Sequence, residues 1–310
     1  MANGQAIAVG VVGVGHLGRL HAMKYAASPK ANLVGVADVD AGRSAAVGRD
    51  LDAAAFSDYR ELIGKVRCVS VAVPTLLHYE ITRAFLSEGI DVLVEKPMTA
   101  SLEEGERLVT LAREKNCILQ VGHLERFNPA VRRLESVIRD PRFIECHRLA
   151  PFVERGTDVD VVLDLMIHDI DIISSLVQSP VERVEAVGVP ILTDKPDIAN
   201  ARIRFANGCI ANVTSSRVSM KRERKVRFFQ PDAYISLDYD QKRAQIYRKT
   251  GKGGGLDSIF GETVEMQDGD ALADEIESFL DVVENRGIPL VSGEEGLKAL
   301  KIASMISEQL

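Results

Sequence analysis

Apolar residues in the first 123 positions occur in short unbroken runs, separated by stretches with helical periodicity. The runs are rich in Val and Ile and lack the alternation of a sheet with one wet face. Strands of a parallel sheet are covered by helices on both faces, so they stay apolar throughout. The pattern predicts a doubly wound α/β Rossmann fold with strands at Ile7–Gly13, Leu33–Asp38, Cys68–Pro74, Asp91–Glu95 and Ile118–Gly122.

Two helices are predicted between these strands, at Glu80–Ser87 and Ser101–Lys115. Ser101 and Glu104 have the spacing of a capping box, in which each side chain accepts the other residue's free backbone N–H. This spacing places a helix start at Ser101.

The pattern changes after Gly122. An apolar helix is predicted over about 159–177, and alternating strands follow. Turn signals at Asn207-Gly208 and Pro231-Asp232 predict hairpins, which join Ala201–Phe205 to Cys209–Val213 and Val226–Phe229 to Tyr234–Leu237. We therefore expect a Rossmann domain at 1–122 and an α+β domain at 123–310 with an open, largely antiparallel sheet.

The end of the chain carries a loop signal and two helix patterns. Lys252–Gly255 reads as a mobile loop, and helices are predicted at Ala271–Glu284 and Glu294–Gln309.

Charge and composition exclude several classes of function. The chain has 38 Lys and Arg against 45 Asp and Glu, a net charge of −7, so nucleic acid is not an expected partner. No apolar run is long enough to span a bilayer, and Ile7–Val14 lacks the flanks of a signal peptide, so a cytoplasmic protein without membrane contact is expected. The four cysteines have no zinc-ligand spacing, and no metal is expected.

A glycine-rich loop follows the first predicted strand and opens a helix: Gly13-Val14-Gly15-His16-Leu17-Gly18. In a dinucleotide fold the three glycines allow a tight turn, close approach of a pyrophosphate and close helix packing. The pyrophosphate rests on free N–H groups at the helix start, beside His16 and Leu17. The alternative is a purely structural glycine turn.

Asp38 ends the second predicted strand, at the distance from the loop where a carboxylate binds the ribose hydroxyls. A carboxylate there repels a 2′-phosphate, which favours NAD over NADP. Arg43 lies nearby and keeps NADP as a less favoured alternative. Asp38 as a simple cap of the next turn is the structural alternative.

Ligands of such sheets bind beyond the carboxyl ends of the strands. Lys96 follows a strand and precedes Pro97, a place from which an ammonium can stabilise a substrate alkoxide; a surface lysine paired to Glu95 is the alternative. The strand-end residues expected beside the cofactor are Pro74, Thr75, His78 and Glu95, although His78 fits a satisfied core histidine equally well. Arg126 and Asn128 follow the fifth strand as substrate-side residues.

A polar stripe marks the helix predicted over about 159–177. At 100° per residue, Asp160, His168 and Asp171 fall within about 40° of Asp164 on a largely apolar helix. Asp164 and His168 at i, i+4 suit acid–base chemistry, with the carboxylate orienting the imidazole. A solvated helix face with a chance histidine is one alternative, and a metal site is the other, since such spacings of acid and histidine also occur in metal sites; hydride transfer itself needs no metal.

With the glycine loop, Glu95-Lys96-Pro97, Gly122 to Pro129 and Asp164-xxx-His168 in order, the chain resembles the Gfo/Idh/MocA oxidoreductase family. The resemblance implies NAD(P)-dependent oxidation of sugars, cyclitols or sugar nucleotides. It assigns catalysis to Lys96, Asp164 and His168 and ribose binding to Asp38. Met166 and Asp158-Val159 depart from the family pattern, which leaves the substrate open. Residues 163–171 look most like a branch that oxidises C3 of UDP-N-acetylhexosamines such as UDP-N-acetylglucosamine.

The mechanism we expect is oxidation of a secondary alcohol: His168 takes the hydroxyl proton, Lys96 stabilises the oxyanion and hydride passes to nicotinamide. Arg155, Arg217 and Lys221 are diphosphate contacts or solvated charges. Two alternatives remain, a C=C or C=N reductase and a non-catalytic NAD-binding regulatory protein. A homodimer or homotetramer through the open sheet is expected.

Overall fold

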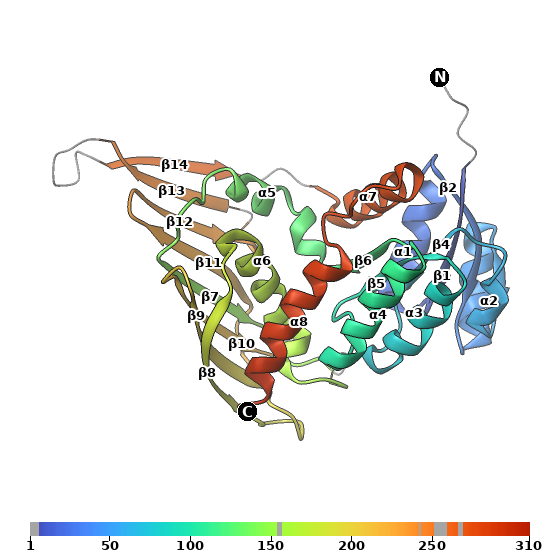
Figure 1. The fold of residues 1–310 in the computed structure, drawn as a ribbon, viewed down its shortest axis with the longest axis horizontal. Helices are drawn as coiled ribbons and strands as arrows, with labels where there is room; N and C mark the ends of the chain where they lie inside the picture. Colours follow the sequence, from blue (N-terminus) through green and yellow to red (C-terminus); the bar gives the residue numbers. More distant parts are fainter. Residues whose placement is uncertain (1–5, 154–156, 242, 251–258, 266–268) are drawn as a thin grey trace. The chain divides into compact units, whose positions relative to one another are not determined.

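The computed structural model describes residues 6–153, 157–241, 243–250, 259–265 and 269–310 (Figure 1). The chain forms two compact units. The first contains the described residues up to Phe127 together with Asp270–Leu300, and the second contains those of Asn128–Gly269 with Lys301–Leu310. The loop predicted at Lys252–Gly255 lies outside the described residues.

The first unit is built on a six-stranded parallel sheet of order β3-β2-β1-β4-β5-β6, which confirms the predicted fold class. Its third strand was not predicted, because Ala54–Phe56 is three residues long, largely exposed and without Val or Ile. The strand order reverses between β1 and β4, the switch point at which such sheets bind ligands. The strands are β1 (Ile7–Val12), β2 (Ala31–Ala37), β3 (Ala54–Phe56), β4 (Cys68–Val71), β5 (Asp91–Glu95) and β6 (Leu119–Gly122).

Helices cover both faces of this sheet (Figure 1). One core cluster contains side chains of α3 and α4, and the other contains side chains of α1, α2 and α7. Ser101 Oγ accepts the Glu104 N–H at 3.3 Å, as the capping pattern predicts. The helices are α1 (His16–Ala27), α2 (Ala41–Leu51), α3 (His78–Ser87), α4 (Leu102–Glu114), α7 (Ala271–Asn285) and α8 (Gly293–Ser307), with 3₁₀ turns at Tyr59–Leu62, Thr75–Leu77 and Leu124–Phe127.

Helix α7 returns from the far end of the chain to complete the first unit. Phe279 is fully buried in the same cluster as strand residues of β1 and β5. Arg67 Nη2 donates to the Val283 carbonyl at 2.6 Å, and Arg286 Nη1 lies 2.6 Å from Asp91 Oδ2. One face of the parallel sheet is therefore covered partly by residues that lie 180 positions downstream of β5 in the sequence.

The second unit is an eight-stranded sheet of order β14-β13-β12-β11-β7-β10-β9-β8, antiparallel except for the β7–β10 pair. Both predicted hairpins are present, with Gly208 at φ +86° in the first. The strands are β7 (Phe143–Leu149), β8 (Val181–Val189), β9 (Ile198–Phe205), β10 (Ile210–Ser216), β11 (Glu223–Gln230), β12 (Ala233–Asp238), β13 (Arg243–Lys249) and β14 (Ile259–Glu265); the helices are α5 (Pro129–Glu135) and α6 (Ile167–Val177).

Aromatic rings form a row on one face of the second sheet. Phe143, Phe229, Tyr234 and Tyr247 are register neighbours on β7, β11, β12 and β13, and successive ring centroids lie 5.1–5.9 Å apart. The residues beside them along the strands, such as Phe228 and Ile246, point the other way and are buried. The rings are half-buried or exposed, so this face of the sheet remains partly open.

Two further observations concern membrane-spanning helices and cysteines. Among the helices of the described ranges, none has both the length and the apolar character that a bilayer crossing requires. All four cysteines are free: Cys68, Cys146 and Cys209 are buried and Cys117 is half-buried.

We predict that Phe279→Ala lowers the free energy of unfolding by about 3–5 kcal/mol, because it opens a cavity where α7 packs on the parallel sheet. Urea denaturation followed by circular dichroism measures the change. Ile288→Ala is the matched control, since Ile288 is 88% exposed and its truncation leaves stability nearly unchanged. Equal, small effects of the two substitutions would contradict the anchoring role of Phe279.

Candidate cofactor and active site

The glycine loop between β1 and α1 has the geometry of a phosphate-binding turn. Gly13 has φ +78°, and a Cβ there would lie 2.5 Å from the Ala72 carbonyl oxygen. A Cβ on Gly18 would lie 1.7 Å from the Gly13 carbonyl oxygen, so side chains are excluded at both positions. By contrast, a Cβ on Gly15 meets nothing within 4 Å. The open space at Gly15 lies where a ligand's pyrophosphate approaches the backbone in this type of loop.

The first turn of α1 offers N–H groups to an anion. Gly15 occupies the N-cap position and provides no side-chain acceptor, and the first turn carries no acidic residue. Helix N-termini with free N–H groups bind phosphate through these groups and the helix dipole. His16 is exposed and Leu17 half-buried at this helix start.

Asp38 connects the end of β2 to the glycine loop. Its Oδ2 accepts the Val14 N–H at 2.9 Å, and its Oδ1 accepts the Asp40 N–H at 2.9 Å. Arg43 Nη1 lies 3.2 Å from both carboxylate oxygens. The Arg43 guanidinium is therefore bound to Asp38. A 2′-phosphate that reaches Arg43 also comes close to the negative charge of the Asp38 carboxylate.

A cleft of about 400 Å³ runs along this edge of the first unit. Gly13, Gly15, Asp38 and Arg43 are among its lining residues, and so is Pro74 from the turn after β4. Pockets of this size accommodate small ligands and parts of cofactors. The cleft has the position and the polar groups expected for the adenosine half of a dinucleotide.

His78 holds the turns that follow β4 and β5 together. It begins α3 and is buried, and its ring nitrogens lie 2.7 Å from the Pro97 carbonyl and 2.9 Å from the Val73 carbonyl. A carbonyl oxygen only accepts hydrogen bonds, so both bonds form together when each ring nitrogen carries a proton. Among the neighbouring predicted cofactor residues, Thr75 is buried and Pro74 is exposed at the cleft.

Lys96 is half-buried at the end of β5, and its peptide bond to Pro97 is cis. The neighbouring Glu95 points inward: its Oε1 lies 2.9 Å from His21 Nε2, and it is not among the described lining residues of the cleft. Burial acts to raise the pKa of Glu95, but the hydrogen bond from His21 and the positive charges of His21, Lys96 and His78 hold it below its ordinary value. Glu95 thus supplies a negative charge beside His21 and Lys96 at the end of β5.

His123 joins this corner at the end of β6, although no role was predicted for it from the sequence. It is fully buried, and burial together with the charges of Lys96 and Arg126 lowers its pKa to about 3. His123 is therefore neutral near pH 7. Arg126 is also buried, and its backbone N–H donates to the His123 carbonyl at 3.0 Å. The sequence signal that could have identified His123 is its position directly after Gly122, the residue that ends β6.

In the second unit, Asp164 and His168 lie on a helix that changes type between them. Residues Val162–Met166 form a π-helical turn that runs directly into α6. The prediction of a uniform 100° per residue is therefore wrong over this segment, because a π turn holds more residues than an α turn. π-bulges occur frequently at functional sites. Asp164 and His168 are both half-buried.

The other acids of the predicted polar stripe have separate roles. Asp160 Oδ1 accepts the N–H groups of Val162 and Leu163 at 2.9 and 3.0 Å, so it caps the start of this helix. Asp171 is buried and lies on α6. Asp169, which the stripe omitted, makes a buried bidentate pair with Arg148 at 2.9 Å.

The proposed diphosphate contacts have different surroundings. Arg217 is buried, pairs with Asp197 at 2.9 Å and donates to the Val159 carbonyl at 3.0 Å, so the interpretation of Arg217 as a phosphate contact or a solvated charge is wrong. Lys221 is exposed, and Arg155 lies outside the described residues. Asn128 caps α5, with its Oδ1 accepting the Ala130 N–H at 3.0 Å.

Comparison with known proteins agrees with this geometry. Residues 7–123 match the oxidoreductase family with an NAD-binding Rossmann fold, Gfo/Idh/MocA, and residues 130–251 match the C-terminal domain of the same family. The chain belongs to the Gfo/Idh/MocA family. It is thus a member of an NAD-binding oxidoreductase family, as the glycine loop and Asp38 indicated.

Several relatives are similar over much of the chain. UDP-N-acetylglucosamine 3-dehydrogenase of Acidithiobacillus ferrooxidans is 39% identical over 96% of this chain and 95% of its own. A solved structure of that enzyme superposes with a TM-score of 0.93 at 37% identity, covering 99% of this chain and 98% of the other. scyllo-Inositol 2-dehydrogenase (NAD(+)) of Bacillus subtilis is 30% identical over 67% of each chain. Levoglucosan dehydrogenase in complex with NADH, at 22% identity and a TM-score of 0.87, shares the fold.

We predict that Asp38→Asn shifts cofactor preference from NAD toward NADP by about tenfold or more. The amide keeps an oxygen for the Val14 N–H but removes the charge that repels a 2′-phosphate and occupies Arg43. Titrations of both cofactors, followed by fluorescence, give the ratio of dissociation constants. Asp50→Asn is the control, since this exposed acid pairs with Arg19. An unchanged ratio in Asp38→Asn would show that Asp38 does not select the cofactor.

Proposed function

We propose that this protein oxidises a secondary alcohol of a sugar nucleotide to a ketone with NAD, the first substrate to test being UDP-N-acetylglucosamine at C3. The observation that carries the proposal is the 39% identity, over nearly the whole of both chains, to an enzyme with that name. The dinucleotide cleft supports the redox half of the proposal. The catalytic assignments come from the family resemblance at Lys96, Asp164 and His168.

In the proposed reaction, His168 accepts the proton of the substrate hydroxyl, and Asp164 orients the imidazole and favours its protonated form. Lys96 donates a hydrogen bond to the oxygen while negative charge develops on it. Bound NAD supplies the acceptor for the hydride that leaves the carbinol carbon. The products are the ketone, NADH and one proton held by His168, so atoms and electrons balance.

The electrostatics of the first unit support the role of Lys96. Neutral His123 and the buried Arg126 guanidinium stand near the ammonium, while Glu95 is already engaged by His21. A cationic corner in which the Glu95 carboxylate is bonded to His21 favours an oxygen that becomes anionic. His78 bonds the Pro97 carbonyl beside Lys96 and the Val73 carbonyl in the turn that lines the cleft, and so it connects this corner to the cleft.

We predict that Lys96→Met and His168→Gln each lower kcat for the nucleotide sugar by about 10²–10⁴-fold, because each removes a group that acts on the reacting oxygen. NADH formation followed by absorbance measures turnover, and NADH fluorescence measures cofactor affinity, which stays close to that of the unmodified protein. Lys115→Met, at an exposed position, and His147→Gln, at a half-buried position of the second sheet, are the matched controls.

A panel of UDP-sugars, free sugars and inositols tests the substrate class. Selective turnover of UDP-N-acetylglucosamine supports the proposal. Turnover of inositol alone would show that the substrate is a cyclitol and not a sugar nucleotide. Tight NADPH use with a C=C or C=N substrate would show that the protein is a reductase of such bonds. NAD binding without turnover across the panel would favour a regulatory protein.

We also propose that the protein assembles as a dimer or tetramer through the open face of the second sheet, in the cytoplasm. The row of aromatic rings ending at Tyr247 gives this face the apolar character of an interface, and Gly261 leaves room for the Tyr247 ring. The four free cysteines are in keeping with a reducing compartment.

We predict that Tyr247→Arg dissociates the assembly without unfolding the chain, since the substitution places a charge in an apolar interface. Light scattering after size exclusion gives the mass, and circular dichroism reports the fold. Ile288→Arg, at an exposed position of the first unit, is the control. A mass that is identical for Tyr247→Arg and the unmodified protein would move the interface elsewhere.

A further inference from the structure

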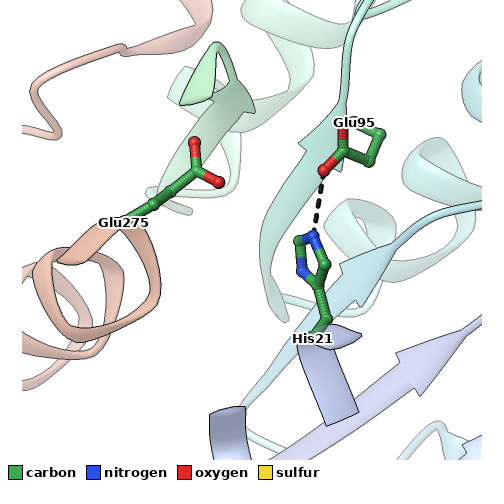
Figure 2. A group of neighbouring side chains, drawn as sticks. All are labelled: His21, Glu95 and Glu275. Atoms are coloured by element: carbon green, nitrogen blue, oxygen red, sulfur yellow. Dashed lines mark hydrogen bonds and ion pairs between the residues drawn. The ribbon is translucent and has the colours of Figure 1, made fainter. Parts of the chain in front are cut away.

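Three potential metal ligands meet inside the first unit, away from the cofactor cleft. His21 comes from α1, Glu95 from the end of β5 and Glu275 from α7 (Figure 2). One ligand atom from each lies within 4.8 Å of the others. His21 and Glu275 are fully buried and Glu95 is 8% exposed. The Glu275 side chain is directed toward the His21–Glu95 pair (Figure 2).

Glu275 is the member that needs an explanation. Both of its carboxylate oxygens are buried, and neither has a hydrogen-bond partner among the described residues. Burial, and then the negative charge of Glu95, raises the pKa of Glu275 well above its ordinary value. Protonation removes the charge but still leaves both oxygens without partners, which is costly in an interior. A cation shared with Glu95 neutralises the two carboxylates and satisfies an oxygen of each.

The surroundings of His21 are those of an oriented ligand. Its Nδ1 lies 3.2 Å from Ser70 Oγ, which in turn lies 2.8 Å from Tyr25 Oη. A hydrogen bond at one ring nitrogen fixes the ring and directs the lone pair of the other nitrogen, as outer residues do around metal-bound histidines. The 2.9 Å contact between His21 Nε2 and Glu95 Oε1 is a hydrogen bond that a proton on Nε2 donates. A divalent ion would take the place of that proton, with Nδ1–H donating to Ser70 and the Nε2 lone pair facing the ion.

We propose that His21, Glu95 and Glu275 bind one divalent transition-metal ion, with Zn²⁺ as the probe. One imidazole and two carboxylates form a ligand set typical of zinc and of neighbouring divalent metals. With metal–ligand bonds of about 2.1 Å, ligand atoms lie at most about 4.2 Å apart. In a tetrahedral zinc site the ligand atoms lie about 3.4 Å apart, so atoms separated by the observed limit of 4.8 Å have to close by about 1.4 Å, a distance that side-chain rotation can supply.

The ion would fasten the returning helix to the sheet. α7 supplies Glu275, whereas β5 and α1 supply the other two ligands, so one ion crosslinks segments 74 and 180 residues apart. This role is structural and independent of the proposed sugar oxidation. The expectation of no metal came from the spacing of the four cysteines, and spacing along the sequence carries no signal for ligands brought together only by folding.

The first experiment uses the full chain without a histidine tag. The protein is dialysed against a chelator, reloaded with Zn²⁺ and freed of excess metal, and mass spectrometry then measures zinc. We expect about one zinc per chain and a rise in melting temperature of about 5–10 °C when zinc is about 100-fold above its dissociation constant. No retained zinc and an unchanged melting temperature overturn the proposal, and a proton or a water then satisfies Glu275.

Variants locate the ion. Glu275→Gln and His21→Gln should weaken zinc binding by about tenfold or more and abolish the thermal shift. Glu277→Gln is the matched control on α7, because the Glu277 side chain is 39% exposed and pairs with Lys30. His147→Gln controls for a surface site, since His147 lies near Glu145 and Glu223 on the exposed sheet face. Zinc lost in His147→Gln but kept in Glu275→Gln would place the ion elsewhere and overturn the assignment.

Absorption spectra with Co²⁺ distinguish a variant that has lost metal binding from one that has lost its folded structure. Co²⁺ held by an imidazole and two carboxylates gives visible absorption bands that hexa-aqua Co²⁺ lacks, and the chain has no other chromophore in this range. Bands in the unmodified protein and in Glu277→Gln, but not in Glu275→Gln, support the proposal, and bands of equal strength in all three overturn it. NADH binding, measured in the same samples, distinguishes this result from failure of the proposed reaction.

Discussion

A parallel sheet buries both of its faces, and this requirement governs the first unit. The helices between its strands cover one face with α3 and α4, and the other face is completed by α7, from residues 271–285. Phe279 and its neighbours enter the core on that side. The same helix carries Glu275 to the His21–Glu95 pair, so covering the sheet also creates the buried polar cluster.

The carboxyl edge of the sheet carries opposite charges at its two halves. At the end of β2, Asp38 presents a carboxylate beside the glycine loop, where a ribose is bound in this fold. At the ends of β5 and β6, Lys96 and Arg126 stand around a neutral His123. The carboxylate suits hydroxyl groups, and the cationic corner suits an oxygen that gains negative charge. This separation follows from strand order and not from proximity in the sequence.

The buried ion pairs of the second unit position backbone. Arg217 pairs with Asp197 and donates to the Val159 carbonyl, which anchors the segment that enters the π turn. Asp160 caps the same segment through two backbone N–H groups. These contacts hold the start of the helix that carries Asp164 and His168. Asp160 and Arg217, whose sequence positions suggested contacts to a ligand, thus hold the backbone of this segment.

Most elements of this fold can be predicted from the amino-acid sequence, because apolar runs, glycines with required conformations and capping residues act over a few neighbouring positions. It placed the strands β1, β2, β4, β5 and β6, the phosphate loop, Asp38 and both hairpins. The distant segments that share a core become known only from the folded chain. The return of α7, the burial of Arg217, the π turn before α6 and the meeting of His21, Glu95 and Glu275 depend on packing between segments far apart in the chain, and local periodicity contains no record of that packing.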